Sequence, residues 1–561
     1  MEKGKKYLFE NLRPNFKRLN TSKVNFRDDN DLLNLASKEK TLIFAKNFNL
    51  ICLALTSVFF LNIFYNLFQI TLNSEKNRKF YSKVNIERGK IFDRNGTLIA
   101  TNLPTFDLYL NTKKLINRKI VKGEIEKIFK NKKSSFINYA FSKKHYILIQ
   151  NNLSNYEINQ LKKIGDPGLV FEKSQKRIYP QHNLFCHITG FLSKFYEPKS
   201  KIEKNFHNKL SNGKNIRLSL DLRIQSIVHE ELSRSMKKYE ANSALALVMN
   251  VNNGEIISMV SLPDFDPNYP EEITAFSENN LVTEARYEMG STLKIFNAAL
   301  AYEIESLATK EIFDVEFPYQ ITHEKQIKDE IKGEKKLTFD DIFIKSSNIG
   351  SIKLLDFMGH EKQKDFFKKI GLTENLNVSG LKTVSNNLPD YWNITASKFI
   401  SFGYGISLSP ISLASSFSTL VNGGFKVKPT ISLGESNQIK RILDIKTSEK
   451  INSLLKRIVE EGTGKKAKVL GLEVGGKTGT SEKFVDGNYN SEKVITSFIG
   501  VFPIKEPKYL TLVLFDEPKR TNNRFLEYFG GDTAAPTFSE ITKKISPILD
   551  KRNYLDSLAL N

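Results

Sequence analysis

The chain has few of the residues that build disulfide frameworks or metal centres. Its 561 residues include only two cysteines, Cys52 and Cys186, which excludes a framework of several disulfide bonds. Cys52 lies in the longest apolar run, which argues against a bond between the two. His182, Cys186 and His187 are close in sequence, but they lack a second cluster of conventional ligands. We therefore expect neither a structural disulfide nor a metal site.

Acidic residues are outnumbered: 62 Asp and Glu face 84 Lys and Arg, and the net charge is +22. Such a charge is compatible with nucleic acid, an anionic membrane surface or an acidic polymer as partner. The first 46 residues contribute only +5, and no dense basic block follows. The sequence also contains no zinc-finger, homeodomain or RNA-recognition motif, so we expect no nucleic-acid partner.

Long hydrophobic runs are scarce as well. One uncharged segment, NFNLICLALTSVFFLNIFYNLF at residues 47–68, reaches the length of about 20 residues that a transmembrane helix needs. We interpret it as an uncleaved anchor, because a long segment precedes it and no small-residue cleavage site follows before Lys76. A buried core helix is the alternative, since Asn49, Asn62 and Asn66 are polar. Lysines flank both ends, so charge alone leaves the orientation open.

The region after this segment divides in two. Residues 87–102, ERGKIFDRNGTLIATN, predict a hairpin with its turn at residues 93–96. The following stretch alternates Lys-rich helical patterns with polar breaks and contains no catalytic constellation, so we interpret it as a support or docking domain. A polar break at residues 211–214 precedes a second domain.

The second domain begins with a strand that leads into an amphipathic helix at residues 215–232, followed by two strands around an Asn-Asn-Gly turn at residues 244–261. Helices are expected around residues 291–303 and 409–422, and strands near residues 472–482, 494–503 and 508–515. Strands at both ends with helices between them predict a mixed sheet covered by helices.

Three short motifs in this domain contain residue types that suit nucleophilic catalysis. Ser291 and Lys294 are three positions apart at the start of an apolar helical run, which places both side chains on one face. A serine hydroxyl is a poor nucleophile until a base takes its proton, and a lysine can be that base if burial or a nearby cation lowers its pKa. Alone, Ser-x-x-Lys occurs by chance in most long chains.

The second motif, Ser346-Ser347-Asn348, places a hydroxyl two residues before a carboxamide at a break after a helical stretch. The third, Lys477-Thr478-Gly479-Thr480, lies on an expected strand opened by two glycines. Its glycine leaves room for another backbone, and its lysine and threonines offer a cation and hydroxyls to a carboxylate. Taken singly, the motifs are equally compatible with a helix cap, a bulge or a solvated charge.

Together and in this order, the motifs resemble those of penicillin-binding proteins and class A β-lactamases. The similarity extends to YEMGSTLK, FGYGISLSPISLASSFSTLVNGG, ERGKIFDRNG and RLSLDLRIQ at residues 287–294, 402–424, 87–96 and 217–225. On these segments, residues 85–545 are similar to the class B penicillin-binding proteins. Two positions depart from the family pattern: Met289 replaces the usual Pro, and Leu281 replaces a common Arg.

Within that class, four segments look most like the division-specific, FtsI-like members: KTGTSEK, SFIGVFP, FDEP and YFGGDTAAP at residues 477–483, 497–503, 515–518 and 528–536. The elongation-specific members are the alternative. The resemblance implies an α+β multidomain chain whose transpeptidase domain has an antiparallel sheet flanked by helices. The implied parts are a cytoplasmic tail, a transmembrane anchor, an elongated dimerisation or pedestal domain, the transpeptidase domain and a C-terminal tail, at residues 1–46, 47–70, 71–212, 213–548 and 549–561.

The resemblance also implies a reaction and its catalytic residues. Ser291 would attack the penultimate D-alanine of a peptidoglycan stem peptide, with Lys294 as the proton acceptor. Ser346 would relay a proton to the departing amine, and Asn348 would hold the substrate amide. The cation of Lys477 would help to keep the accepting lysine neutral.

The remaining implied roles concern substrate binding. The backbone N–H groups of Ser291 and Thr480 would form an oxyanion hole. Lys477, Thr478 and Thr480, with Gly479 between them, would bind the terminal carboxylate. No metal, nucleotide or organic cofactor is implied.

The implied ligands are stem peptides ending in D-Ala-D-Ala and β-lactams. The implied protein partners are the polytopic septal glycosyltransferase and other divisome membrane proteins. The implied location is the inner membrane, with the catalytic domain in the periplasm at the division septum. A β-lactamase is the nearest alternative enzyme, although no Glu-x-x-Leu-Asn segment follows Ser346 to place a hydrolytic water. A D,D-carboxypeptidase and a non-catalytic scaffold that binds peptide or β-lactam are further alternatives.

Overall fold

The computed structural model describes residues 50–67, 87–142, 146–323, 325–329, 333–435, 440–519 and 529–559. The chain separates into two compact units, residues 1–85 and 86–561. In the first unit, the helix Leu50–Leu67 is long and apolar enough to cross a membrane, and no part of it is buried within the protein. The cytoplasmic tail expected at residues 1–46 lies outside the described residues.

The second unit begins with the predicted hairpin. Strand β1 (Ile91–Phe92) turns back into the long strand β2 (Leu98–Asn111), and the two pair antiparallel. Asp93 stabilises the turn because its Oδ1 accepts hydrogen bonds from the backbone N–H groups of Asn95 and Thr97, at 2.9 and 2.7 Å. The hairpin prediction is therefore confirmed.

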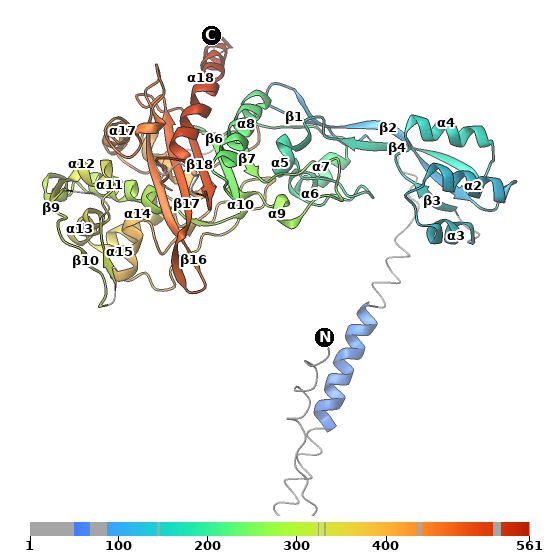
Figure 1. The fold of residues 1–561 in the computed structure, drawn as a ribbon, viewed down its shortest axis with the longest axis horizontal. Helices are drawn as coiled ribbons and strands as arrows, with labels where there is room; N and C mark the ends of the chain where they lie inside the picture. The colour runs from blue at the N-terminus through green and yellow to red at the C-terminus, as the bar shows by residue number, and fades with distance from the viewer. Residues whose placement is uncertain are drawn as a thin grey trace, which may run out of the picture. The chain divides into compact units, whose positions relative to one another are not determined.

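β2 is also the centre of the pedestal sheet. It pairs antiparallel with β4 (Leu169–Ile178) and β3 (Tyr146–Gln150), while β1 pairs in parallel with β5 (Ile216–Arg217). Three helices gather around one end of β2 and β4: α2 (Arg118–Ile128), α3 (Ser134–Ser142) and α4 (Asn155–Ile164) (Figure 1). They enclose a small apolar core formed by residues such as Leu108, Val121, Ile125, Ile149 and Leu161.

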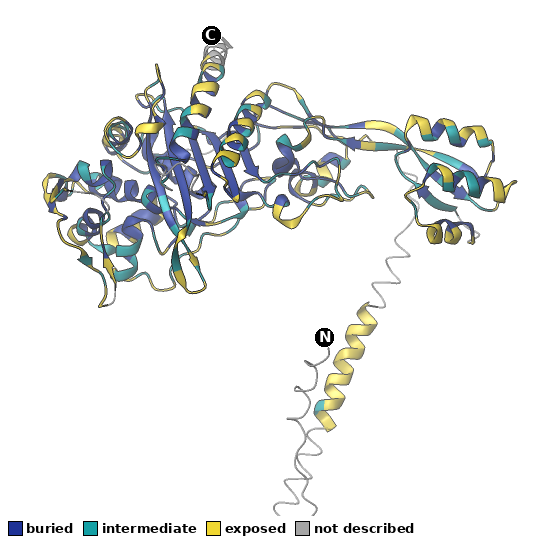
Figure 2. Ribbon diagram, in the orientation of Figure 1, coloured by how far each residue is buried: buried dark blue, intermediate teal, exposed yellow. Residues whose placement is uncertain are grey.

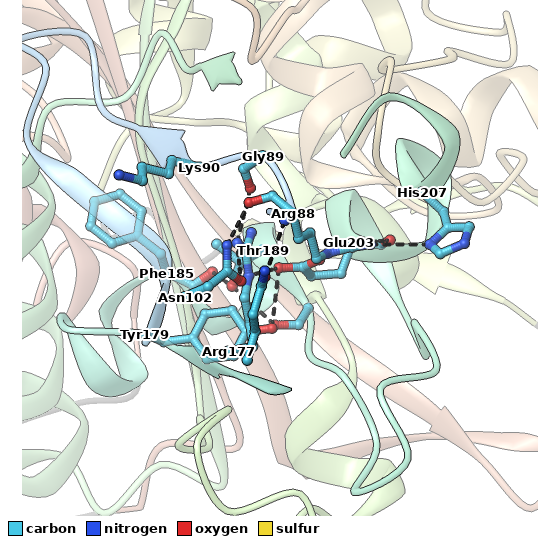
Figure 3. A network of polar contacts seen from close by, with 12 residues as sticks. Arg88, Gly89, Lys90, Asn102, Arg177, Tyr179, Phe185, Thr189, Glu203 and His207 are labelled. Carbon is cyan, nitrogen blue, oxygen red and sulfur yellow. Dashed lines mark hydrogen bonds and ion pairs between the residues drawn. The ribbon is translucent and has the colours of Figure 1, made fainter. Parts of the chain in front are cut away.

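A buried ion network joins this sheet to the short helix α6 (Lys201–Asn205). The carboxylate of Glu203 is fully buried and accepts hydrogen bonds from Arg88 Nε at 2.8 Å and Arg177 Nε at 2.7 Å (Figure 3). Tyr179 donates a third, at 3.2 Å. Two guanidinium groups thus share one buried carboxylate, which fixes the start of the second unit to α6.

The larger part of the second unit is built on a five-stranded sheet. In spatial order its strands are β16 (Gly475–Val485), β17 (Asn488–Phe502), β18 (Tyr509–Asp516), β6 (Ser243–Asn250) and β7 (Ile256–Leu262). All neighbouring pairs are antiparallel. The mixed sheet expected from the order of the elements is therefore wrong. Short connections make antiparallel neighbours of β16, β17 and β18 and of β6 and β7, and β18 also pairs antiparallel with β6, which is distant in sequence. The antiparallel sheet that the family resemblance implies is confirmed.

Helices cover both faces of this sheet, whose strands are largely buried (Figures 1 and 2). On one face, α8 (Leu222–Lys238) and α18 (Ala534–Ala559) pack against Phe498 and Phe515. On the other face, α11 (Lys294–Glu303), α16 (Pro410–Val421) and α17 (Ile445–Glu460) share a core with the alternate strand residues. The strand-to-helix transition predicted at residues 215–232 is confirmed by β5 and α8. Helix α18 runs through residues 549–559, where a tail was expected.

Further helices lie at the end of the domain that carries α11. They are α12 (Phe339–Ile344), α13 (Asn348–Met358), α14 (His360–Lys369) and α15 (Ile394–Phe402). The remaining short helices are α5 (Cys186–Thr189), α7 (His207–Ser211), α9 (Ala275–Glu278) and α10 (Leu281–Glu284), with 3₁₀ turns η2 (His182–Phe185), η3 (Gly290–Leu293), η4 (Leu307–Lys310) and η5 (Lys465–Ala467). The remaining short strands are β8 (Tyr287–Glu288), β9 (Ile312–Asp314), β10 (Tyr319–Gln320), β11 (Gln326–Ile327), β12 (Lys336–Thr338), β13 (Ser407–Leu408), β14 (Phe425–Lys426) and β15 (Lys440–Arg441).

Candidate active site

Ser291 lies in the 3₁₀ turn η3, which continues directly into α11. The backbone N–H of Lys294 donates to the carbonyl of Ser291, so the two residues are one turn apart and their side chains lie on the same side. Lys294 is fully buried, whereas Ser291 is partly exposed. The turn therefore presents a hydroxyl to solvent while its neighbouring amine lies inside the domain.

Lys294 connects the first motif to the second. Its Nζ donates to the carbonyl oxygen of Ser346 at 2.5 Å and to Oδ1 of Asn348 at 2.7 Å, and it lies 3.3 Å from Ser346 Oγ. Ser346 has a φ of +61°, a left-handed conformation that serine rarely adopts. The buried amine of Lys294 therefore holds a strained turn between α12 and α13 through the carbonyl of that turn.

Lys477 adds the third motif to this cluster. Its Nζ lies 2.9 Å from Ser346 Oγ, 3.3 Å from the Thr478 carbonyl oxygen and 3.4 Å from Thr478 Oγ1. Ser346 Oγ thus contacts the amines of both Lys294 and Lys477. The structure brings four predicted site residues from three distant segments into direct contact, the fourth being Asn348.

Gly290 and Gly479 allow β16 to lie directly against the turn that holds Ser291. A Cβ on Gly290, whose φ is +53°, would lie 2.3 Å from the Thr480 carbonyl oxygen and 3.0 Å from the Thr480 nitrogen. A Cβ on Gly479 would lie 2.7 Å from the Met289 carbonyl oxygen. The backbones of Ser291 and Thr480, which carry the two predicted oxyanion-hole N–H groups, therefore belong to segments in direct contact.

Two more glycines surround this contact. A Cβ on Gly403, with φ +109°, would lie 2.0 Å from the Gly290 carbonyl oxygen, and one on Gly530 would lie 2.4 Å from the Gly479 carbonyl oxygen. The Gly530 N–H donates to Thr480 Oγ1 at 3.0 Å. Four backbone segments are thus packed together around the turn, which fixes the position of its partly exposed hydroxyl.

The two departures from the family pattern leave this arrangement intact. Met289 is buried with a φ of −83°, close to the range that proline adopts. Its carbonyl accepts a hydrogen bond from Thr292 Oγ1 at 2.8 Å. Leu281 is buried in the main core at the first position of α10.

The motifs also contact side chains that were not predicted as site residues, among them Thr463 and Asp329. Thr463, in the loop after α17, places its Oγ1 2.9 Å from Thr478 Oγ1. Asp329, which follows β11, accepts hydrogen bonds at the start of α13. Neither belongs to a periodic pattern or to a motif with its own chemistry, so only the three-dimensional contacts identify them.

Burial dominates the electrostatics of Lys477. Removal from water lowers the pKa of its ammonium group well below the usual 10.5, and repulsion from the charge of Lys294 lowers it further. Since the repulsion is mutual, a charge on one amine disfavours a charge on the other.

This lowered pKa predicts how stability depends on pH. Between the lowered pKa of Lys477 and 10.5, the unfolded chain binds more protons than the folded one, so the free energy of unfolding rises with pH. We expect Lys477→Met to remove this contribution and to reduce the slope. Denaturant unfolding at several pH values from 7 to 10 measures it, with Met at the exposed Lys446 as the control. Equal slopes for the wild type and Lys477→Met would contradict the prediction.

The His and Cys residues near position 186 make contacts within the protein. His187 Nε2 lies 2.7 Å from the Ser277 carbonyl oxygen, and Cys186 Sγ lies 3.4 Å from His187 Nδ1. His182 pairs with Asp266 at 2.7 Å. Among the described residues, no group of three or more His, Cys, Asp or Glu side chains is arranged to hold a metal ion.

Comparison with known proteins places this cluster in a family. Residues 244–543 match the family described as penicillin binding protein transpeptidase domain, and residues 83–216 match the penicillin-binding protein dimerisation domain. The chain belongs to the penicillin-binding proteins. All three motifs of this penicillin-binding protein lie inside the match to the transpeptidase domain.

Individual relatives agree with the family. This penicillin-binding protein is 30% identical over 479 residues to "Probable peptidoglycan D,D-transpeptidase FtsI" of Caulobacter vibrioides, covering 82% of the chain and 81% of the relative. It is 29% identical over 497 residues to "Probable peptidoglycan D,D-transpeptidase PenA" of Neisseria meningitidis, covering 81% and 83%. A solved peptidoglycan synthetase from Bifidobacterium adolescentis has the same fold, with a TM-score of 0.64 at 18% identity, over 83% of this chain and 96% of that one.

Proposed function

We propose that this penicillin-binding protein is a peptidoglycan D,D-transpeptidase that cross-links stem peptides at the division septum. The observation that supports the reaction best is that the amines of Lys294 and Lys477 both contact Ser346 Oγ, beside the turn that holds Ser291. The similarity to a relative named FtsI supports the septal role. The helix Leu50–Leu67 supports a membrane anchor, with the catalytic domain outside the cytoplasmic membrane.

In the acylation step, Ser291 Oγ attacks the carbonyl carbon of the penultimate D-alanine. A bond forms between Oγ and that carbon, and the hydroxyl proton passes to neutral Lys294. Negative charge develops on the carbonyl oxygen. This oxygen then accepts hydrogen bonds from the backbone N–H groups of Ser291 and Thr480. A donor of this kind typically stabilises the transition state by about 3 kcal/mol.

The carbon–nitrogen bond to the terminal D-alanine then breaks. Its nitrogen needs a proton, and Ser346 Oγ lies within 3.3 Å of Lys294 Nζ, where it can relay that proton outward. Asn348, whose Oδ1 is held by Lys294, orients the substrate amide with its remaining hydrogen-bonding groups. D-alanine leaves and an acyl-enzyme remains on Ser291.

Substrate binding and proton transfer are coupled through Lys477. The terminal carboxylate of the stem peptide binds Lys477, Thr478 and Thr480, and its negative charge favours the protonated form of the lysine. A protonated Lys477 then disfavours charge on Lys294, because their repulsion is mutual. Binding of the correct carboxylate thus prepares the neutral base that the hydroxyl requires.

Deacylation completes the cross-link. An amine of a neighbouring stem peptide attacks the acyl carbon and gives a proton to Lys294. The new carbon–nitrogen bond forms, the bond from that carbon to Ser291 Oγ breaks, and Lys294 returns the proton to Oγ, which restores the hydroxyl. A β-lactam acylates the same serine, but its leaving group stays tethered and blocks the second step. Side chains and backbone groups of this chain perform each of these steps.

The reaction is tested with the full-length protein in detergent micelles. Labelled penicillin should form an adduct that mass spectrometry places on the peptide containing Ser291. With a pentapeptide donor and an acceptor amine, D-alanine should appear together with cross-linked product. Hydrolysis without cross-linking would indicate a carboxypeptidase, and rapid turnover of penicillin would indicate a β-lactamase. Binding without acylation would indicate a scaffold.

The septal role is tested in cells. Depletion of the protein followed by microscopy should give filaments, because septa would not close while elongation continues. Rounded cells would instead indicate the elongation-specific role. Crosslinking in the membrane should recover a polytopic glycosyltransferase if the protein acts within a septal complex.

Gly290 gives a prediction that separates site geometry from stability. Gly290→Ala should lower penicillin acylation about 10²-fold, because its Cβ would meet the Thr480 carbonyl and displace the turn that holds Ser291. The control is Gly165→Ala in the pedestal, which has a similar φ of +68° and no atom within 4 Å of the added carbon. Both substitutions should cost about 1 kcal/mol of stability through their positive φ, and Gly290→Ala should cost more because its Cβ also meets the Thr480 carbonyl. Equal acylation rates for the two variants would refute the geometric role.

A further inference from the structure

Asp329, which lies outside the three motifs, accepts hydrogen bonds at the start of helix α13. Its Oδ1 accepts hydrogen bonds from the backbone N–H groups of Asn348 at 2.6 Å and Ile349 at 3.1 Å. Its Oδ2 accepts a hydrogen bond from the hydroxyl of Ser347. That hydroxyl in turn accepts a hydrogen bond from the Gly350 N–H at 2.7 Å. One carboxylate therefore binds, directly or through Ser347, the first three N–H groups of the helix.

These donors belong to the motif that completes the active site. The helix begins at Asn348, whose side-chain Oδ1 accepts from Lys294, and two residues before it lies Ser346, whose Oγ contacts both active-site lysines. Asp329 thus fixes the backbone at the start of the helix. Lys294 fixes the side chain of Asn348 and the carbonyl of Ser346. A carboxylate also suits the positive end of the helix dipole.

The conformation of Ser346 shows why the contacts of both Lys294 and Asp329 are needed. Its φ of +61° is strained for a residue with a side chain, and such strain persists only where the surroundings over-determine it. Lys294 binds the carbonyl of this residue, on one side of the turn. Asp329 binds the next three residues, on the other side. Without the hydrogen bonds of Asp329, the turn can relax and move Ser346 Oγ away from the two lysines.

We propose that Asp329 is a positioning residue for acylation, which holds Ser346 and Asn348 in the geometry that proton relay and amide binding require. The inference rests on the proposed function. Asp329 contacts Ser347 and the α13 backbone, so it acts through the motif and not on the substrate. Removing it should slow the chemical step more than it weakens binding, because the Lys477 strand that would bind the carboxylate has its own support in β17.

The structure provides a matched control elsewhere in the chain. Asp166, in the pedestal, is a carboxylate that accepts three backbone hydrogen bonds, from Ile116 at 3.0 Å, Asn117 at 2.9 Å and Gly168 at 2.8 Å. Asp166→Ala removes the same kind of group with a similar number of bonds, in a separate hydrophobic core. Asp329→Asn is the conservative variant, because its amide oxygen still accepts from Asn348 and Ile349.

The experiment measures acylation of the full-length protein by a fluorescent penicillin, with the rate of the chemical step separated from the dissociation constant of the initial complex. Thermal unfolding of each variant is measured in parallel, and rates are taken well below every midpoint. We expect Asp329→Ala to slow the chemical step about 10²-fold with little change in the dissociation constant. Asp329→Asn should recover part of the rate but stay slower than the wild type, because its amide nitrogen cannot accept from the Ser347 hydroxyl. Asp166→Ala should leave the rate unchanged.

The outcomes distinguish this inference from the function on which it rests. Wild-type protein that is not labelled at Ser291 would overturn the proposed function and the inference together. Labelling of the wild type with an equally fast chemical step in folded Asp329→Ala would overturn the inference alone. If Asp329→Ala does not fold, the rate of Asp329→Asn decides: a step slower than that of Asp166→Ala supports positioning, and an equal step overturns it.

Discussion

Replacing Ser291 by alanine is expected to abolish covalent penicillin labelling and to lower acylation by at least about 10⁴-fold. The hydroxyl that forms the acyl bond is lost, and Thr292, the other hydroxyl residue of the turn, is buried and donates to the Met289 carbonyl. The substitution should be nearly neutral for stability, because Ser291 is partly exposed and its turn is held by backbone contacts at Gly290. Gel fluorescence and intact-mass spectrometry of the labelled protein measure the result.

Ser346 provides the critical comparison, because its hydroxyl contacts the amines of both lysines and is the obvious rival nucleophile. Ser346→Ala should retain labelling at Ser291 with a slower rate, since only the relay is removed. Labelling that survives in Ser291→Ala and disappears in Ser346→Ala would reverse the assignment. Ser154→Ala, which removes a helix cap in the pedestal, controls for a general loss of stability.

Lys294 should be the second largest determinant of the rate. Lys294→Met is expected to slow acylation by about 10³-fold, because it removes the proton acceptor of the attacking hydroxyl. It also leaves the Ser346 carbonyl and Asn348 Oδ1 without their buried donor. Stopped-flow acylation, with the dissociation constant of the initial complex determined separately, gives the effect on each step.

An arginine at the same position separates proton transfer from support. Lys294→Arg retains a cation with several N–H donors, but its guanidinium group stays protonated and cannot accept a proton. If Lys294 is the base, Arg should restore part of the stability lost in Lys294→Met and almost none of the rate. An Arg variant that acylates within tenfold of the wild type would refute the role of Lys294 as proton acceptor.

The sequence predicted the three motifs of the site, but local patterns did not predict that the motifs lie together in space. Spacing alone placed Ser291 and Lys294 on one face, and Lys477 on a strand. The contacts that join the motifs span 52 residues from Lys294 to Ser346 and 131 residues from Ser346 to Lys477. No local pattern contains such information, so the resemblance to a family had to supply the expectation that the three motifs meet.

Other features had no sequence signal at all. The left-handed φ of Ser346 is imposed by lysine and aspartate contacts from distant segments, and serine has no preference for that conformation. Asp329 follows a two-residue strand, where a lone aspartate is an ordinary surface residue. The expected mixed sheet was wrong for a related reason: the order of strands and helices does not determine strand direction, which depends on the length and path of each connection.

The glycines around the Ser291 turn limit how this protein can change under drug selection. An added carbon at Gly290, Gly403, Gly479 or Gly530 would lie within 2.4 Å of another atom, in three cases a main-chain oxygen. No other amino acid fits at these positions without displacing a neighbour. An inhibitor that binds mainly to the main chain here would therefore contact a surface that a point mutation cannot change. Resistance would have to arise farther out, at side chains that the natural peptide tolerates losing.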